Sequence, residues 1–388
     1  MAFFVSLTNF SICWSIKIRL VFDKSLCPDG SSGSYSTINA MNGVTVCRCA
    51  IAIMVILECH SFGDTYNVID LGALGGYYSR AYDINNVGQI VGLAEVRAGE
   101  HRAFLYAKGT MNDLGTLGGK LSVATGINDN GIVTGYSYIS QNNTIYHPFI
   151  YSNGQMSDIG TLGGQNGIAC DINNSLQIVG STQTSTGADH PFLYSNGTML
   201  DIGSSPSIYG GVALGINNYG QTVGYIKGKD WSDYGFLYYD NVAQRLPCYL
   251  ANNINDSAQI VGQIWIEGWC GCLVQSDTVI LIGGVSAYGI NSSGDVVGYG
   301  SEGAYIYSDG LFQNLNNLLE ENPGWFLAEA TDINDLGQIV GVGINPAGLT
   351  HAFLLQPIKT SVPDSASSIS LLFLGLLITV TSRSYFKI

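Results

Sequence analysis

The sequence predicts an all-β protein, a closed seven-bladed β-propeller whose blades each contain four short strands. Three observations lead to this prediction: a recurring Ile-Asn motif, the strand patterns that accompany it, and a strand count that closes a ring. The motif's Asn occurs seven times, 36 to 45 residues apart, at Asn85, Asn128, Asn173, Asn217, Asn255, Asn291 and Asn334. A repeat of about 40 residues is typical of propellers, whose blades bury their apolar faces against one another.

Each repeat is expected to contribute four antiparallel strands. In the first repeat these are Ala81–Asn85, Gln89–Val96, Ala103–Ala107 and Thr110–Leu114. A tight turn joins the first two strands, because Gly88 can take the positive φ that closes such hairpins. Four other repeats keep this glycine, at Gly131, Gly220, Gly294 and Gly337. Leu176 and Ala258 replace it in the remaining two repeats, so we expect those turns to adopt another form.

Two further motifs accompany the repeats. Asp-Leu-Gly-x-Leu-Gly-Gly precedes the first strand at residues 70–76 and 113–119, and residues 158–164 carry its Ile variant. His-Ala-Phe or a variant opens the third strand, at residues 101–104 (with Arg102 inserted), 147–149, 190–192, 234–236, 303–305 and 351–353. The fifth repeat has Trp269-Cys270-Gly271 in this place. Four His share this position, so they would lie around a ring, and we expect each to hydrogen-bond to a neighbouring turn rather than to a shared metal.

The strand count closes the ring. Seven sets of the first three strands are present, but the fourth strands are offset along the chain. One such strand, Tyr66–Leu71, precedes the first set, and none follows the last third strand, His351–Leu355. The N-terminal strand is therefore expected to complete the last blade, which leaves no long unpaired edge.

Composition agrees with this architecture and excludes one class of partner. Only 11% of residues are charged, against roughly 25% in typical soluble domains, and 50 are Gly, as short and tightly turned strands require. The net charge is −14 without a Lys or Arg cluster, which argues against nucleic acid. The Leu-Gly-Gly loops lack the Lys and the helix of a phosphate loop, and no metal or cofactor is predicted. A bridge from Cys248 to Cys270 or Cys272 is left open.

The predicted propeller spans residues 64–357. The segments before and after it resemble targeting signals. Residues 41–63 have a basic start, an apolar stretch and small residues, as in a secretory signal peptide with cleavage near residues 59–64. Residues 1–40 form an N-terminal extension, either a membrane anchor or a mis-called start upstream of Met41, and we favour the second reading.

The C-terminal end has the layout of a sorting tail. A linker, residues 358–368, contains Val-Pro-Asp-Ser, and residues 369–388 form a short hydrophobic segment with a basic end. This layout resembles the PEP-CTERM family, whose usual motif is Val-Pro-Glu-Pro. The resemblance implies handling by exosortase-type machinery, transient membrane contact through the tail, and an extracellular or cell-surface location. An ordinary C-terminal membrane anchor is the alternative.

The Asp-Leu-Gly-x-Leu-Gly-Gly and His-Ala-Phe motifs together resemble the extracellular HAF-repeat family, over nearly the whole repeat region. That resemblance implies a secreted or surface-held bacterial protein and agrees with the two targeting segments. It implies no established reaction, and no catalytic motif occurs in the sequence.

The candidate ligand-binding residues lie where the repeats depart most from their pattern. Two connections between second and third strands, in the fourth and fifth repeats, are rich in Trp and acids: Asp230, Trp231 and Asp233 in one, and Trp265, Glu267 and Trp269 in the other. These loops should emerge side by side, and aromatic faces flanked by carboxylates suit a polysaccharide or a protein partner. We therefore predict an exported binding or structural module. The alternatives are a surface polysaccharide hydrolase or lyase with the loop carboxylates as acid and base, and Trp side chains that only pack between blades.

Overall fold

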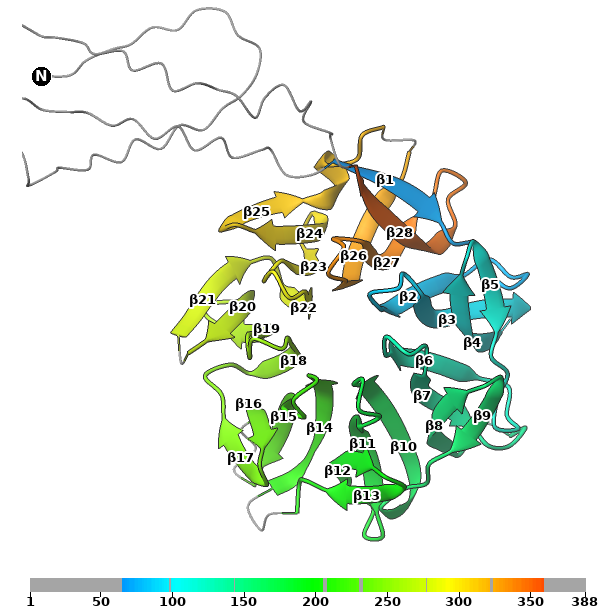
Figure 1. Cartoon of the computed structure of the whole chain (residues 1–388), viewed down its shortest axis with the longest axis vertical. Helices are drawn as coiled ribbons and strands as arrows, with labels where there is room; N and C mark the ends of the chain where they lie inside the picture. The colour runs from blue at the N-terminus through cyan, green and yellow to red at the C-terminus, as the bar shows by residue number, and fades with distance from the viewer. Residues whose placement is uncertain are drawn as a thin grey trace, which may run out of the picture. The chain divides into compact units, whose positions relative to one another are not determined.

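The computed structural model describes residues 65–358, except residues 98, 143, 205–207, 230–232, 277 and 322–323. The N-terminal extension, the signal peptide and the C-terminal tail predicted above lie outside these residues. Within the described part, the chain forms seven four-stranded antiparallel sheets. Figure 1 shows them arranged as the blades of a propeller, so the predicted fold class is confirmed.

Six blades are built from consecutive strands. The first contains β2 (Ser79–Ile84), β3 (Ile90–Arg97), β4 (Glu100–Ala107) and β5 (Thr110–Asp113). The second contains β6 (Ser122–Ile127), β7 (Val133–Tyr138), β8 (Tyr146–Ser152) and β9 (Gln155–Asp158). The third contains β10 (Gly163–Ile172), β11 (Ile178–Thr184), β12 (Asp189–Ser195) and β13 (Thr198–Asp201). The fourth contains β14 (Ile208–Ile216), β15 (Thr222–Gly228), β16 (Asp233–Tyr239) and β17 (Val242–Arg245). The fifth contains β18 (Leu250–Ile254), β19 (Ile260–Trp265), β20 (Trp269–Gln275) and β21 (Thr278–Gly283). The sixth contains β22 (Ser286–Ile290), β23 (Val296–Gly300), β24 (Gly303–Ser308) and β25 (Leu311–Asn314), followed by a short 3-10 helix, η2 (Leu315–Asn317).

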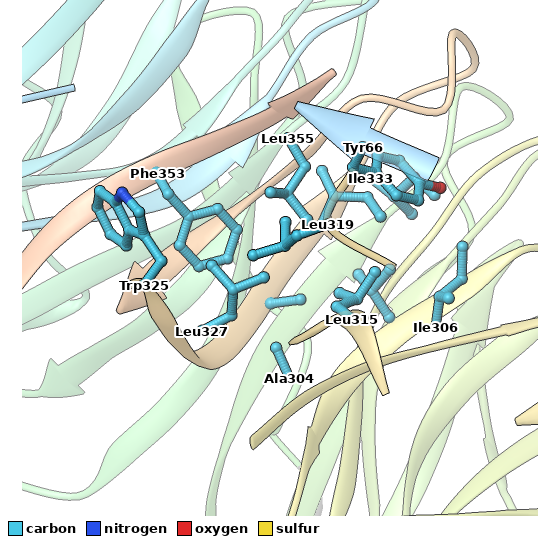
Figure 2. Close-up of a cluster of buried hydrophobic side chains, with 13 residues drawn as sticks. Tyr66, Ala304, Ile306, Leu315, Leu319, Trp325, Leu327, Ile333, Phe353 and Leu355 are labelled. Carbon is cyan, nitrogen blue, oxygen red and sulfur yellow. The ribbon is translucent and has the colours of Figure 1, made fainter. Parts of the chain in front are cut away.

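The seventh blade joins the two ends of the repeat region. Its strands are β26 (Phe326–Ile333), β27 (Ile339–Ile344) and β28 (Thr350–Ile358), and its outer strand is β1 (Thr65–Asp70), which pairs with β28 from Thr65↔Ile358 to Asp70↔Phe353. The predicted closure by the N-terminal strand is confirmed. Figure 2 shows that Tyr66 of β1 lies in an apolar cluster with Leu319, Ile333 and Leu355, so β1 contributes to the core as well as to the sheet.

A buried aromatic ring facing a glycine recurs in the blades and explains two of the repeated motifs. Phe104 pairs with Gly92, and the same pairing joins Phe149, Phe192, Phe236 and Phe353 to the glycine of the preceding strand. A Cβ on Gly92 would lie 2.0 Å from the Arg80 carbonyl oxygen and 2.8 Å from the Phe104 ring. Only glycine fits there, because the innermost strand bulges toward it between Ala81 and Asp83.

The fifth blade corrects one alignment made from the sequence. Cys272 pairs with Gly262, so Cys270-Gly271-Cys272, rather than Trp269-Cys270-Gly271, takes the place of His-Ala-Phe. Cys272 packs in one apolar cluster with Cys248, and the two thiols contact each other as free cysteines. The shift places Trp269 outside the packed core, beside the turn that closes the β19–β20 hairpin.

The turns between the first and second strands of the blades share one conformation. Gly88, Gly131, Gly220, Gly294 and Gly337 have φ between 75° and 87°, as predicted. Leu176 and Ala258 have φ of 60° and 57°, and their amides donate to the carbonyls of Asn173 and Asn255, as in the glycine turns. The expectation of a different turn at these two positions is therefore wrong.

The repeated Asn explains why all seven turns are alike. Each Asn side chain donates from Nδ2 to the main-chain carbonyl of the corresponding Asn in the next blade, over 2.9 to 3.4 Å. The last of these bonds runs from Asn334 to Asn85, so the bonds form a closed ring. A turn of another shape would interrupt that ring, and the ring therefore imposes a left-handed residue even where the sequence offers Leu or Ala.

The His-Ala-Phe and Asp-Leu-Gly motifs meet in the structure. Nδ1 of His147 lies 2.6 Å from the Asp158 carboxylate, and the pairs His190–Asp201 and His351–Asp70 are each 2.8 Å apart. The other oxygen of Asp158 accepts the Gly160 amide and caps the following turn. The predicted hydrogen bond of these His is therefore present, and the Asp of the second motif is its partner.

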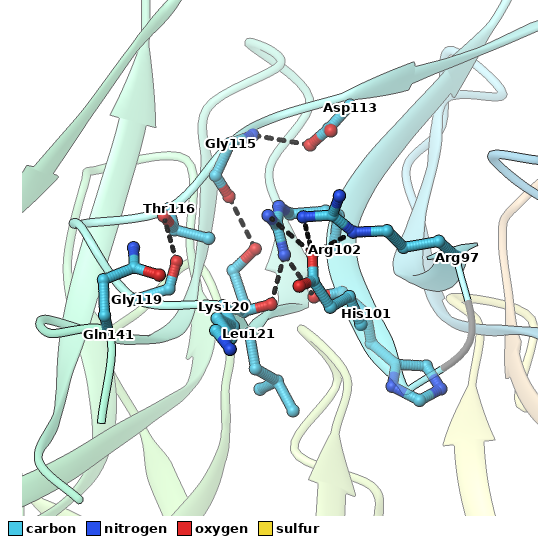
Figure 3. A network of polar contacts seen from close by, with 12 residues as sticks. Arg97, His101, Arg102, Asp113, Gly115, Thr116, Gly119, Lys120, Leu121 and Gln141 are labelled. Atoms are coloured by element: carbon cyan, nitrogen blue, oxygen red, sulfur yellow. Dashed lines mark hydrogen bonds and ion pairs between the residues drawn. The ribbon is translucent and has the colours of Figure 1, made fainter. Parts of the chain in front are cut away.

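The first blade uses a different contact in this place. Arg102 stands two residues before Phe104, where the other blades have His, and it donates to the Lys120 carbonyl and lies 3.7 Å from Glu100 (Figure 3). His101 turns aside and packs edge-on against Tyr78. Arg102 thus links the first blade to the connection that leads into the second.

None of the helices in the described ranges is long and apolar enough to cross a membrane.

Candidate ligand-binding site

The site is built on the hairpin between β19 and β20 of the fifth blade. Trp265 and Trp269 face each other as the last pair of this ladder, joined by a three-residue turn in which the Ile266 amide donates to the Gly268 carbonyl. Directly opposed residues point to the same side of a hairpin, so both indoles lie on one surface. Their ring centroids are 5.0 Å apart in an edge-on arrangement. Trp265 is 60% exposed and Trp269 is 40% exposed.

Tyr249 extends the two indoles into a row of three rings. It lies in the connection that enters the fifth blade, where its amide donates to the Gln263 carbonyl. Its ring centroid lies 4.9 Å from that of Trp269. The Tyr249 hydroxyl donates to the Asp233 carboxylate of the fourth blade over 2.9 Å. This hydrogen bond raises the pKa of Tyr249, which therefore remains a neutral phenol at physiological pH.

We call Tyr249, Trp265, Trp269 and Asp233 the aromatic platform. The structure brings three of the predicted site residues together, Asp233, Trp265 and Trp269, across the two neighbouring loops. Glu267 is exposed in the turn between the two Trp, with a φ of 54°. Asp230 and Trp231 lie outside the described residues.

The sequence analysis missed Tyr249. It belongs to the connection between the fourth and fifth blades, whereas the predicted site residues all come from connections between second and third strands. Both kinds of connection reach the same face of a propeller. The sequence feature that indicates Tyr249 is therefore an aromatic residue one position before the innermost strand of the blade that carries the Trp-rich hairpin.

Packing between blades does not account for the two described loop Trp. Trp325 shows what that role looks like, since it is 7% exposed and lies in the apolar cluster that joins residues of the sixth and seventh blades (Figure 2). Trp265 and Trp269 are instead largely exposed to solvent. Exposed indole faces beside a carboxylate can stack on the C–H face of a sugar ring while the carboxylate accepts a hydroxyl hydrogen bond.

Comparison with known proteins relates the chain to others by fold only. Neither a family model nor a curated protein matches its sequence. Among solved structures, YCF48 bound to D1 peptide matches with a TM-score of 0.46 and 11% identity, over 77% of this chain and 97% of that one. TolB from Acinetobacter baumannii matches with a TM-score of 0.42 and 9% identity, over 73% of this chain and 65% of that one. An Aleuria aurantia lectin in complex with a fucosylated sugar matches with a TM-score of 0.33 and 11% identity, over 74% and 98%. At these identities and scores, the similarity says nothing about ligand or activity.

The fold and the site together define a class: a seven-bladed propeller that presents exposed aromatic rings beside a carboxylate on one face.

Proposed function

We propose that this protein is an exported, surface-sorted module that binds a polysaccharide through the aromatic platform. The row formed by Tyr249, Trp269 and Trp265 is the observation that carries the proposal. Three adjacent rings on one surface suit a ligand that itself repeats, and a chain of sugar rings does so. Asp233 supplies a hydrogen-bond acceptor at one end of the row.

Export and surface sorting are supported by the sequence of the two ends. The signal-like residues 41–63 and the PEP-CTERM-like tail both indicate passage across a membrane, and the His-Ala-Phe repeats resemble a family of secreted proteins. N-terminal sequencing of protein released by the producing cell tests this part. We expect a mature start near Asp64, and removal of residues 358–388 should move the protein from the cell surface to the medium. Recovery of an uncleaved chain from the cytoplasm would contradict it.

Binding is tested with the purified protein on a glycan array, followed by titration of the glycans that bind. Stacking contributes on the order of 1 kcal/mol per ring, so Trp269→Ala and Trp265→Ala should each weaken binding about fivefold. Both variants should keep the melting temperature of the parent, because the indoles are exposed. Tyr77→Ala is the matched control, since Tyr77 is a 74% exposed aromatic residue in the connection that leads into the first blade.

Two results would redirect the proposal. Binding to no glycan, combined with capture of a defined peptide that Trp269→Ala abolishes, would make the platform a protein-binding surface. Release of products from a polysaccharide, lost in Glu267→Gln, would make the protein a hydrolase or lyase.

A further inference from the structure

A hollow of about 420 Å³ lies between the third and fourth blades. Its walls come from β10, β11, β14 and β15, from the start of β12 and the turn before it, and from the start of β8. Pockets that hold small organic ligands usually range from about 300 to 1,000 Å³. The hollow is therefore large enough for a sugar unit and is separate from the Trp hairpin of the fifth blade.

The side chains that line the hollow combine aromatic walls with hydrogen-bonding groups. Tyr146, Tyr209 and Tyr225 contribute rings and hydroxyls, Asp189 contributes a carboxylate, and Lys227 contributes an ammonium group. Burial, with the nearby Asp233 and Asp189 carboxylates, raises the pKa of Tyr225 and keeps its phenol a neutral donor. Rings for stacking together with several donors and acceptors suit a polyhydroxylated ligand better than a hydrocarbon one.

The hollow adjoins the aromatic platform. Tyr225, which lines the hollow, interacts electrostatically with both Asp233 and Tyr249 of the platform. Lys227 stands directly opposite Asp233 in the β15–β16 ladder. The hollow and the platform therefore share the Lys227–Asp233 end of the β15–β16 hairpin, and a ligand longer than one sugar unit can contact both.

The charges around this track have an excess of acid. Asp189, Asp233 and Glu267 are acidic, whereas Lys227 in the lining and Lys229 in the adjoining connection are basic. The chain as a whole carries a net charge of −14. Like charges repel, so a polyanionic glycan is disfavoured at this face and a neutral or amino-sugar chain is favoured.

We propose that the hollow between the third and fourth blades is a second sugar subsite, so that the protein binds a neutral or amino-sugar oligosaccharide extending from the hollow onto the aromatic platform. This inference rests on the proposed function. It adds a minimum ligand length, because one sugar ring cannot occupy both places, and a preference against uronic acids.

The test is a chain-length titration with the full-length protein. Cello-oligosaccharides and chitosan oligomers, from monosaccharide to hexasaccharide, are compared with oligogalacturonides of the same lengths by calorimetry. Affinity for one of the first two series should rise at least tenfold with length and then level off, and oligogalacturonides should bind more weakly. Tyr209→Ala and Asp189→Asn should remove most of that rise and leave binding of the shortest ligands unchanged. Trp269→Ala should weaken every length, and Tyr77→Ala none.

The outcomes separate the two proposals. If binding requires Trp269 but is independent of chain length, or if Tyr209→Ala and Asp189→Asn keep the full rise, the hollow is not a subsite and the platform proposal stands. Tighter binding of oligogalacturonides would overturn the charge preference. If no series binds, and Trp269→Ala behaves as the parent does, the second subsite and the proposed function fall together.

Discussion

Leu176 and Ala258 show at the scale of one residue how the ring of Asn overrides local preference. Both hold a left-handed backbone that costs an L-residue about 1–2 kcal/mol relative to the right-handed one, and glycine avoids that cost in the other five turns. The two residues stay there because Asn173 and Asn255 hold the chain on both sides. The Asn255 side-chain oxygen, for example, accepts the amides of Ser257 and Gln259 over 3.0 Å.

Substitutions in two of these turns should have opposite effects. Ala258→Gly should raise the free energy of unfolding by about 1 kcal/mol, because it relieves the left-handed conformation. Gly88→Val should lower it by about 1–3 kcal/mol, since a β-branched side chain is strained there. Ser257→Gly is the control within one turn, because Ser257 is not left-handed and should lose stability. Chemical denaturation measures all three, and a loss of stability in Ala258→Gly would contradict the argument.

At the scale of one element, β1 holds the ring closed. It forms a complete ladder with β28, and Tyr66 also bonds through its backbone to Leu318 and Glu320 near the sixth blade. Asp70, at the end of β1, forms a hydrogen bond with His351. This pair is equivalent to the His–Asp pairs of the second and third blades, but its two residues come from opposite ends of the repeat region. The strand therefore supplies a sheet edge, a buried aromatic side chain and a polar contact.

Tyr66 should be the side chain on which this closure depends most. It is 5% exposed in the cluster of Figure 2, so Tyr66→Ala should cost about 3–5 kcal/mol, as large aromatic truncations in cores do. Asn67→Ala on the same strand points to solvent and should change stability by less than about 0.5 kcal/mol. Thermal unfolding of both variants tests this, and deletion of residues 64–72 should destabilise all seven blades together. Equal stability of the two alanine variants would show that β1 is dispensable for closure.

At the scale of the whole ring, an odd number of blades creates one unfavourable junction. The position two residues before each repeated Asn alternates between a polar side chain and glycine: Asp83, Gly126, Asp171, Gly215, Asn253, Gly289 and Asp332. The glycine makes room for its neighbour, since a Cβ on Gly289 would lie 2.7 Å from the Asp332 Cα. Seven positions cannot alternate without a break, so Asp332 and Asp83 meet where the ring closes.

This junction should make stability depend on pH. Burial raises the pKa of both Asp83 and Asp332, whose carboxyls hydrogen-bond to each other and so retain a proton. Burial also raises the pKa of Asp171 to about 7. A group whose pKa is higher in the folded state than in the unfolded state stabilises the folded state. Its contribution is fully present at a pH below the pKa of the unfolded state, which is near 3.8 for Asp. That contribution is lost as pH rises through the folded value.

The free energy of unfolding should therefore fall by a few kcal/mol between about pH 5 and about pH 8, as expected for carboxyl groups with raised pKa values. Asp332→Asn should reduce the fall, because an amide can donate to Asp83 without a shared proton. Asp171→Asn should do the same, as Asn253 occupies the equivalent position in the fifth blade. Asp240→Asn, at an exposed turn, is the control. Denaturation at the two pH values decides, and identical pH dependence in Asp332→Asn and the parent would rule out the junction as its source.

The repeated residues predicted most of the fold, and the departures from the repeat predicted three residues that the structure brings together in the candidate site. Asn85 and its equivalents, the turn glycines and the offset strand at residues 66–71 were each sufficient for a correct expectation, because each reflects a need that recurs in every blade. Trp265, Trp269 and Asp233 were identified because no such need explains them. The predicted alignment of Trp269-Cys270-Gly271 with His-Ala-Phe was wrong because Cys272 replaces the Phe of that motif. In the sequence alone Trp269 is the large residue nearest the expected position, and only the pairing of Cys272 with Gly262 identifies the correct one.

The sequence by itself determined the number of blades, the order of their strands and the closure of the ring, because these follow from spacing and periodicity along the chain. The tertiary structure decided which side chains from different blades meet: Tyr249 with Asp233, and Asp332 with Asp83. Contacts of this kind depend on the distance between blades and on which face a connection reaches. Neither quantity is encoded in the spacing of residues within one repeat. The candidate site, unlike the scaffold, therefore depends on contacts between neighbouring blades, and only the tertiary structure shows those contacts.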